Sequence, residues 1–279
     1  MDEEAVRSED HHTTDDERMD VTGVVPSNQE QPDAIAEVCL RTSTPIKREG
    51  YELFPEDIER TKDGFMLNDK IINVYFELLA KHSKVGVYVF STFFYTTLSK
   101  RGIPWVQRWT SGINIFENRL VYIPVYIPGH WMLIVFDVKK KVLEHYDSMG
   151  NAYTEVVHRI LRYIRDEWSR VHKSEPSLSV DIKRKIPLQR NGRDCGVFVC
   201  MFGRYRLCGN EVWLSSDRIP RFRKLMLHEI VSGKILYNVF HKLVQPSSGL
   251  REHKGEVTDK KLLALETYEE VTKEKGSRR

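Results

Sequence analysis

Cysteine is scarce in this chain of 279 residues, and long hydrophobic runs are missing altogether. The four cysteines, Cys39, Cys195, Cys200 and Cys208, form no C-x-x-C pair and are too few for the disulfide framework of a small secreted protein. No apolar stretch approaches the roughly 20 residues that a membrane-spanning helix needs. The acidic first 20 residues lack the apolar segment of a secretory signal or a transit peptide. We therefore expect a protein of a reducing, intracellular compartment with no membrane span.

The composition divides the chain into three parts. A hydrophobic fraction of 41% and an aromatic fraction of 10% are typical of a globular protein. Residues 1–45 are acidic, polar and poor in aromatics, which predicts a disordered tail. We expect one folded domain over residues 46–245 and a polar C-terminal extension over residues 246–279. Residues 36–250 carry a net charge of about +11, which suits an acidic partner but equally describes an evenly solvated surface.

Hydrophobic periodicity predicts an α+β fold. Apolar residues at three- and four-residue spacing predict a helix that Asn68 or Asp69 caps and that ends near His82. Strands at 120–127, 131–138 and 142–146 follow one another closely and predict an antiparallel meander at the centre of a mostly antiparallel sheet flanked by helices. We also expect the start of a helix at 54–58, strands at 87–90 and 178–182, and helices at 93–102, at 151–172, from residue 195 and at 219–235. The apolar residues Leu262, Leu263, Leu265 and Val271 predict a short additional helix in the C-terminal extension.

Cys195 is the candidate nucleophile. The polar run Asn191–Asp194 delivers it to the start of an apolar helix, where free backbone N–H groups and the helix dipole favour a thiolate. Gln189, six positions earlier, could supply an amide to a developing oxyanion together with the backbone N–H of Cys195. A buried helical cysteine with a structural role is the simpler interpretation of the same pattern. The assignment therefore depends on finding a base.

His130 and Asp147 are the candidate base and its orienting carboxylate. His130 begins a predicted strand after a Pro-Gly turn, and Asp147 ends the neighbouring strand. A hairpin through Lys139–Lys141 makes them cross-strand neighbours, so the carboxylate can fix the tautomer of the imidazole. A metal site formed by His130, His145 and Asp147 is the competing chemistry, but no fourth ligand or H-x-x-x-H spacing supports it. We expect neither a metal nor a cofactor.

Seven ordered motifs resemble one family, the SUMO-specific cysteine proteases of the Ulp and sentrin-protease group. These motifs are Leu67-Asn68-Asp69-Lys70-Ile71-Ile72-Asn73, Arg108-Trp109-Thr110, Ile115-Phe116, His130-Trp131-Met132-Leu133, Tyr146-Asp147-Ser148-Met149-Gly150, Gln189-x-Asn191-Gly192-x-Asp194-Cys195-Gly196-Val197-Phe198 and Arg221-Phe222-Arg223-Lys224. The resemblance covers about residues 50–237. It implies a permuted papain-like α+β domain in which the nucleophile comes last in the sequence.

The resemblance also implies roles for single residues. His130, Asp147 and Cys195 match the catalytic triad of the family, and Gln189 matches its oxyanion-hole side chain. Among the substrate-binding positions, Trp131 matches the residue over the Gly-Gly tail of the modifier, and Asp69 and Trp109 match residues that dock its globular body.

One position departs from the family pattern. Met66 stands where the family has tryptophan, so one aromatic wall of the tail tunnel is either missing or supplied by Phe65.

These observations predict a thiol isopeptidase that cleaves after the C-terminal Gly-Gly of a ubiquitin-like modifier, with SUMO favoured. The expected partners are the modifier and proteins conjugated to it; we expect a monomer and no nucleic-acid partner. By resemblance, the nucleus is the favoured location, with the cytoplasm as the alternative. Two other functions stay open: an acyltransferase that uses the same triad, and a catalytically silent module that binds SUMO.

Overall fold

The fold is known from a computed structural model that describes residues 44–208 and 214–244. The strands are β1 (Ile46–Arg48), β2 (Tyr51–Leu53), β3 (Val87–Val89), β4 (Leu120–Ile127), β5 (His130–Asp137), β6 (Val142–Tyr146) and β7 (Ser179–Ile182). The helices are α2 (Pro55–Glu59), α3 (Asp69–Lys81), α4 (Phe93–Arg101), α5 (Ile103–Gln107), α6 (Thr154–His172), α7 (Cys195–Cys208), α8 (Ile219–Ser232) and α9 (Tyr237–Val244), with short 3₁₀ turns at Ile115–Glu117 and Ser216–Arg218.

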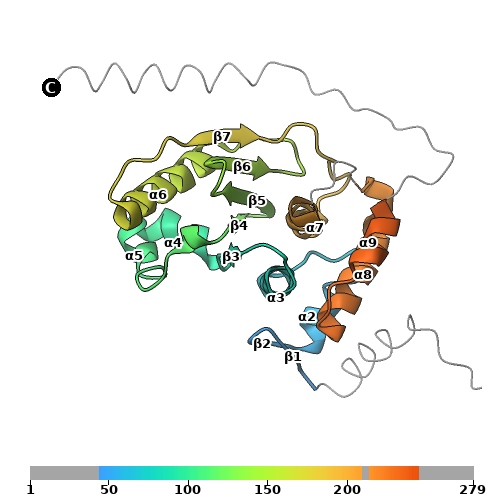
Figure 1. Ribbon diagram of the computed structural model, residues 1–279. Coiled ribbons are helices and arrows are strands. Elements are labelled where there is room, and N and C mark those ends of the chain that lie inside the picture. Colours follow the sequence, from blue (N-terminus) through green and yellow to red (C-terminus); the bar gives the residue numbers. More distant parts are fainter. Residues whose placement is uncertain (1–43, 209–213, 245–279) are drawn as a thin grey trace, which may run out of the picture.

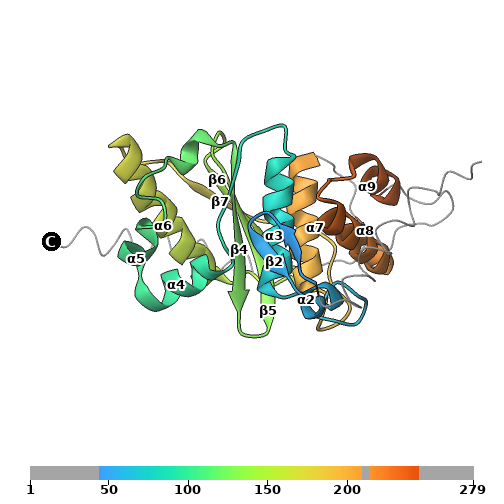
Figure 2. The same ribbon diagram turned by 90° about the horizontal axis from the view of Figure 1, so that it is seen from below.

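A five-stranded sheet lies between two groups of helices (Figures 1 and 2). Its strand order is β3-β4-β5-β6-β7; the three central strands are antiparallel, and both edge strands pair in parallel. The predicted central meander is therefore confirmed, and the complete sheet is mixed. The β4–β5 register pairs Ile127 with His130, so the turn consists of Pro128 and Gly129 alone. Gly129 adopts φ +79°, which favours glycine.

Each face of the sheet has its own core, because side chains alternate along a strand. In β5, Leu133 and Val135 pack with α3, α7 and α8, whereas Met132 and Ile134 pack with α4 and α6. The central strands are buried on both faces, and β5 is buried along its whole length. The rigid centre of the sheet thus holds the first residue of β5, His130, in a fixed place.

The predicted helix at Asn68 is confirmed, and its cap is as expected. The Asn68 side chain accepts a hydrogen bond from the backbone N–H of Ile71, and the helix runs over Asp69–Lys81. The hairpin of β1 and β2, the short helix α5 and helix α9 were not predicted. The β1–β2 hairpin has only three residues in each strand, and α9 follows closely after α8, where the sequence pattern indicated a single last helix.

Three sequence predictions fall outside the described residues. These are the acidic tail, apart from its last two residues, the extension over 246–279, and a short helix around Leu262–Val271. No helix in the described ranges has both the length and the apolar character that a membrane crossing requires.

Gly203 allows helices α7 and α3 to pack closely. A Cβ atom added at Gly203 would overlap with Cε1 of Phe76, whose ring is fully buried. We expect Gly203→Ala to lower the free energy of unfolding by about 1–3 kcal/mol, because the rigid ring has to shift. Urea denaturation measures the loss, and Gly112→Ala, where no atom lies within 4 Å of the added Cβ, is the matched control. Equal stabilities for the two variants would contradict this packing argument.

Candidate active site

Cys195 is the first residue of α7 and is delivered there by a tight polar turn. The Asn191 side-chain oxygen accepts hydrogen bonds from the backbone N–H groups of Arg193 and Asp194 at 2.9 and 3.0 Å. Its amide donates to the Asp194 carboxylate at 2.8 Å. This turn leaves Cys195 at the N-terminal end of the helix, where free N–H groups favour negative charge. The residue is only 1% exposed, so only a thin group can reach its sulfur.

His130 and Asp147 form a buried pair beside the ends of β5 and β6. The β5–β6 register pairs Leu133 with Tyr146, so Asp147 continues opposite Met132 and His130 is its diagonal neighbour on the same face. The ring nitrogen Nε2 of His130 is hydrogen bonded to Oδ1 of Asp147. The other carboxylate oxygen, Oδ2, accepts the backbone N–H of Asn151 at 2.7 Å. The second bond fixes the carboxylate, which in turn orients the imidazole.

The structure also places His130 close enough to Cys195 for the two groups to affect each other's protonation. Burial on its own lowers the pKa of His130, but the hydrogen bonds and charges of Asp147 and Cys195 outweigh it and raise the pKa to about 9. At neutral pH the ring is therefore protonated. Because Nε2 faces Asp147, the other ring nitrogen is left for the thiol. The arrangement is that of a nucleophile, a base and an orienting acid.

Gln189 lies in the loop before Cys195, and both the oxygen and the nitrogen of its side-chain amide form hydrogen bonds. Its oxygen accepts from the Ser148 hydroxyl at 2.6 Å, and its nitrogen donates to the Asn191 carbonyl at 2.5 Å. The backbone N–H of Gln189 also donates to the Ser148 carbonyl at 2.9 Å. The amide is thus fixed between the loop that follows Asp147 and the turn that precedes Cys195. Its role in an oxyanion hole stays a prediction.

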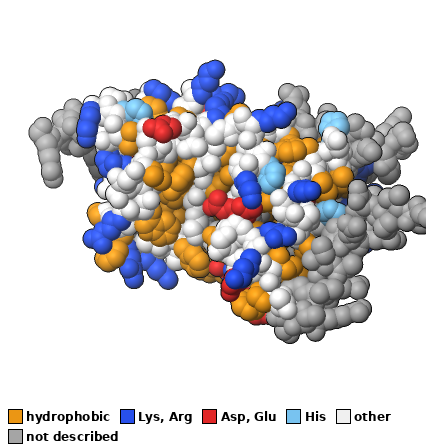
Figure 3. All heavy atoms as spheres, turned by 60° about the horizontal axis from the view of Figure 1, so that its bottom comes forward, with side chains coloured by type: hydrophobic (Ala, Val, Ile, Leu, Met, Phe, Trp, Pro, Cys, Tyr) orange, Lys and Arg blue, Asp and Glu red, His pale blue; other side chains and the backbone are white. Residues whose placement is uncertain are grey.

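The predicted substrate-binding residues do not form one cluster. Trp131 is 6% exposed and packs against Tyr126 with ring centroids 4.8 Å apart. Asp69 begins α3 on one side of the sheet, whereas Trp109 follows α5 on the other side and is 38% exposed. Figure 3 shows hydrophobic side chains gathered over the end of the molecule that carries α4 and α5, with Lys and Arg around them. Asp69 and Trp109 therefore lie next to helices that cover opposite faces of the sheet.

Phe65 and Met66 differ in their exposure. Phe65 is 40% exposed, whereas Met66 is partly buried and packs against the core beneath α3 and α7. The more exposed aromatic ring is thus the one at position 65. Both interpretations of Met66, a missing aromatic wall and a wall supplied by Phe65, therefore agree with these exposures. Mutations at the two positions can distinguish them.

We expect Met66→Trp to raise affinity for a Gly-Gly tail if the aromatic wall is missing. The expected gain is about 0.5–1.5 kcal/mol, because a flat ring covers an extended backbone with less loss of side-chain entropy than a thioether. If Phe65 already forms the wall, Met66→Trp crowds the channel and Phe65→Ala is the damaging change. Measuring kcat/KM for both variants on one substrate decides between the two. If Met66→Trp lowers kcat/KM and Phe65→Ala lowers it severely, the interpretation that the aromatic wall is missing is wrong.

Sequence reasoning missed one aromatic residue beside the His130–Asp147 pair, Tyr153. Tyr153 stacks on the His130 ring with centroids 5.8 Å apart and an interplanar angle of 28°. It also adopts a left-handed conformation with φ 43°, which is uncommon outside glycine. His145 meets the same tyrosine edge to face at 6.5 Å. The sequence contained only a weak signal for Tyr153, namely its closeness to Asp147 along the chain, whereas His145 was predicted only as a ligand of the alternative metal site.

His145 is buried next to the His130–Asp147 pair and stays neutral. Burial is the main cause that lowers its pKa to about 4, and the charge of Arg184 lowers it further. Neither ring nitrogen has a hydrogen-bond partner. Within residues 44–208 and 214–244, no group of three His, Cys, Asp or Glu side chains is arranged to hold a metal ion. The alternative metal site of His130, His145 and Asp147 therefore has no support in the described geometry.

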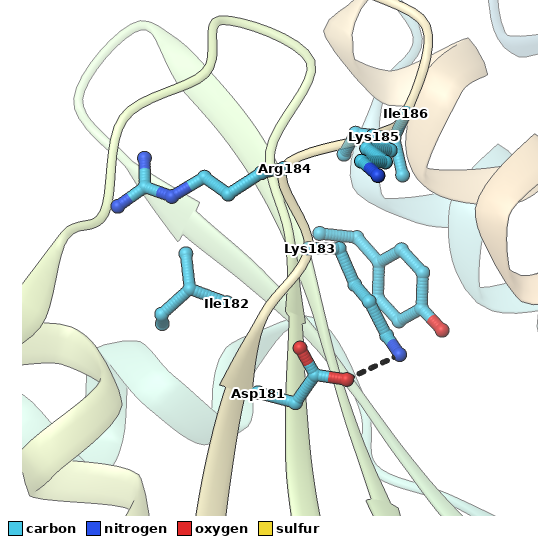
Figure 4. A pocket seen from close by; sticks show the side chains of 7 residues that line it. Asp181, Ile182, Lys183, Arg184, Lys185 and Ile186 are labelled. Atoms are coloured by element: carbon cyan, nitrogen blue, oxygen red, sulfur yellow. Dashed lines mark hydrogen bonds and ion pairs between the residues drawn. The ribbon is translucent and has the colours of Figure 1, made fainter. Parts of the chain in front are cut away.

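A pocket of about 370 Å³ lies at the end of β7. His130, Asp147 and Cys195 are not among the residues that line it. It is lined by Tyr146, Asp181, Ile182, Lys183, Arg184, Lys185 and Ile186. Figure 4 shows the Lys183 side chain turned toward Asp181, with which it pairs at 2.5 Å, while Arg184 and Ile182 point to the other side of the strand. The pocket follows the sheet edge and is separate from the site around Cys195.

Residues 66–233 match one family model, described as the Ulp1 protease family, C-terminal catalytic domain. Among curated proteins, the chain is 36% identical over 189 residues to sentrin-specific protease 2 of Mus musculus, covering 64% of this chain and 32% of that protein. It is 35% identical over 196 residues to a sentrin-specific protease of Caenorhabditis elegans, covering 67% and 28%. The chain thus spans about a third of the length of these curated relatives.

A solved structure is similar over nearly its whole length. It is the X-ray structure of the C-terminal Ulp1 protease domain in complex with Smt3, the yeast ortholog of SUMO. The TM-score is 0.66 and the sequence identity is 26%, with 75% of this chain and 98% of that chain covered.

Proposed function

Because the chain belongs to the Ulp1 protease family, we propose that it is a cysteine peptidase that cleaves after the C-terminal Gly-Gly of SUMO or a related ubiquitin-like modifier. The family supplies the reaction class, and the names of the relatives support the substrate. One observation carries the proposal: His130 is hydrogen bonded to Asp147 and lies next to Cys195, which begins a helix. Residues 46–245 are the proposed protease domain.

The proposed first step is attack by the Cys195 sulfur on the carbonyl carbon of the terminal glycine. The proton that the thiol loses resides on His130, whose raised pKa of about 9 keeps the ring protonated at neutral pH. As the tetrahedral intermediate collapses, the carbon–nitrogen bond breaks and His130 gives its proton to the leaving lysine amine. Asp147 supports the imidazolium and holds its orientation throughout.

The second step is hydrolysis of the resulting thioester. His130 takes a proton from water, the water oxygen attacks the carbonyl, and the modifier leaves with a free carboxylate while Cys195 is regenerated. In both steps negative charge develops on the carbonyl oxygen. The backbone N–H of Cys195 and the amide of Gln189 are the proposed donors to it, since preorganised donors at that position stabilise the transition state.

The proposed binding surface has two parts. Trp131, with Phe65 or Met66, lines the channel for the tail, and the 1% exposure of Cys195 fits a substrate end as thin as Gly-Gly. Asp69 and Trp109 contact the globular body of the modifier. The partners are then the modifier and the proteins conjugated to it, in the nucleus or the cytoplasm, with the enzyme acting as a monomer.

A SUMO molecule that ends in a C-terminal electrophile tests the proposal. We expect a covalent adduct on Cys195, mapped by mass spectrometry, and none with Cys195→Ala. Matching ubiquitin and other modifier probes resolve the substrate class. Binding without an adduct would identify a silent SUMO-binding module. Transfer of an acetyl group from acetyl-coenzyme A to a protein side chain, without cleavage of any modifier probe, would identify an acyltransferase.

A further inference from the structure

A buried arginine on α8 joins two segments that are distant in the sequence. Arg223 is 2% exposed, and its guanidinium donates to the backbone carbonyls of Arg60, Lys62 and Phe65 at 3.3, 3.0 and 2.7 Å. It also donates to Oδ1 of Asp194 at 2.6 Å. The planar, forked guanidinium is suited to hold several oxygens at once. One side chain thus fixes the 60–65 loop and the turn before Cys195.

The 60–65 loop leads directly into the proposed channel wall. It ends at Phe65, whose carbonyl is one of the acceptors, and continues into Met66 and Leu67. Leu67 then packs on the nucleophile helix, because a Cβ atom added at Gly196 would lie 3.0 Å from the Leu67 Cβ. The wall and the first turn of α7 are therefore in contact at the residue next to Cys195.

Asp194 places a carboxylate immediately before the nucleophile. A negative charge at this position disfavours a thiolate on Cys195. The guanidinium of Arg223 forms an ion pair with this carboxylate, and their side chains are only 2% and 11% exposed. Water screens such a pair weakly, so losing the arginine would leave an uncompensated charge on the residue that precedes Cys195.

A second buried ion pair on the same two helices has none of these contacts. Arg204 of α7 donates to the Glu229 carboxylate of α8 at 2.7 and 2.5 Å and to the Tyr75 hydroxyl at 2.9 Å. In the hydrogen bonds of the described residues, this pair reaches neither Asp194 nor the 60–65 loop. It stabilises the packing of α7 on α8, and it separates general stability from an effect on Cys195.

We propose that Arg223 is a positioning residue for the peptidase reaction. It holds the wall at Phe65 and Met66 and the turn before Cys195 in one arrangement, and it offsets the charge of Asp194, the residue that precedes the nucleophile. This inference rests on the proposed function, because it assumes that Cys195 is the nucleophile. A purely structural arginine would change stability alone.

Alkylation of Cys195 by iodoacetamide at pH 7 tests the charge effect without any substrate. Mass spectrometry gives the rate at Cys195 itself, at a temperature well below the unfolding transition of each variant. We expect Arg223→Gln to slow alkylation at least about tenfold, and Asp194→Asn added to Arg223→Gln to restore most of the rate. Glu229→Gln should lower Tm with little change in the rate, and Arg221→Gln, an exposed residue of the same helix, should change neither.

Arg223→Lys separates charge from geometry, because an ammonium keeps the charge but cannot span four acceptors. For Arg223→Lys we expect an alkylation rate at Cys195 close to that of the parent chain and a KM for the modifier substrate that is raised several-fold. A rate for Arg223→Gln within twofold of the parent, no recovery in the double variant, or equal effects of Arg223→Gln and Glu229→Gln on alkylation would each overturn the inference. No preferential alkylation of Cys195 in the parent chain would instead refute the proposed nucleophile.

Discussion

Cys195→Ser should reduce kcat/KM for a SUMO conjugate by at least about 10⁴-fold while leaving the Kd of the modifier unchanged. The hydroxyl is almost the same size as the thiol, so the packing at the start of α7 is kept. It is far less acidic, however, and the proton that His130 accepts from a thiol is not readily given up by serine. Turnover is measured by gel with the purified chain, and the Kd by calorimetry with the same variant.

The other described cysteines provide the matched controls. Burial raises the pKa of Cys200 and of Cys208, which favours the unreactive thiol form. Cys200→Ala and Cys208→Ala should therefore retain kcat/KM within about threefold, with any loss confined to stability. Turnover retained by Cys195→Ser would remove Cys195 from the reaction.

Asp147→Asn should lower kcat/KM by about 10³- to 10⁴-fold, because an amide cannot support the imidazolium and can select the wrong tautomer of His130. Asn is nearly isosteric, and the oxygen that accepts the Asn151 N–H can be retained, so the loop should keep its shape. Far-UV circular dichroism and Tm check that the fold is unchanged. Activity within tenfold of the parent would assign the orienting role to another group.

The same variant should change the pH profile. In the parent chain the pKa of His130 is raised to about 9, so the proton needed by the leaving amine is present below about pH 9 and lost above it. The basic limb of kcat/KM should lie near pH 9 and move to lower pH in Asp147→Asn, since burial then opposes the charged ring with less compensation. The pair's contribution to folding stability is also complete below pH 6.5 and lost as the pH rises through about 9. An unmoved basic limb would contradict this account.

Local patterns in the sequence were sufficient to predict the central sheet and the His130–Asp147 pair. Two short turns connect β4, β5 and β6, so alternation and turn chemistry fix the register over 27 residues. The register then places His130 diagonally opposite Asp147 with no long-range information. The start of α7 was predictable for the same reason, since the Asn191–Asp194 turn is stabilised by its own neighbours.

The contacts that complete the site depend on parts of the chain that are distant in sequence. Arg223 lies 158 residues from Phe65 and 29 from Asp194, and no periodicity links such positions. Tyr153 reaches His130 through a left-handed backbone conformation that its residue type does not favour. The resemblance motif included Arg223 but gave no indication of which atoms it contacts. The exposure of Phe65 relative to Met66 is likewise set by the packing of the loop on α8.

The position of Arg223 near the end of the folded chain has a consequence for the order in which the site forms during synthesis. As the chain leaves the ribosome from its N-terminus, the β4–β6 meander and its His130–Asp147 pair can form while α7 and α8 are still missing. The 60–65 loop, made early, has to wait for Arg223 to supply its hydrogen-bond donors. Bonds over such sequence separations form late because the loop-closure entropy comes first. A nascent chain that ends before α8 should therefore hold the imidazole pair but have an unreactive thiol, and activity should appear only after α8 has docked.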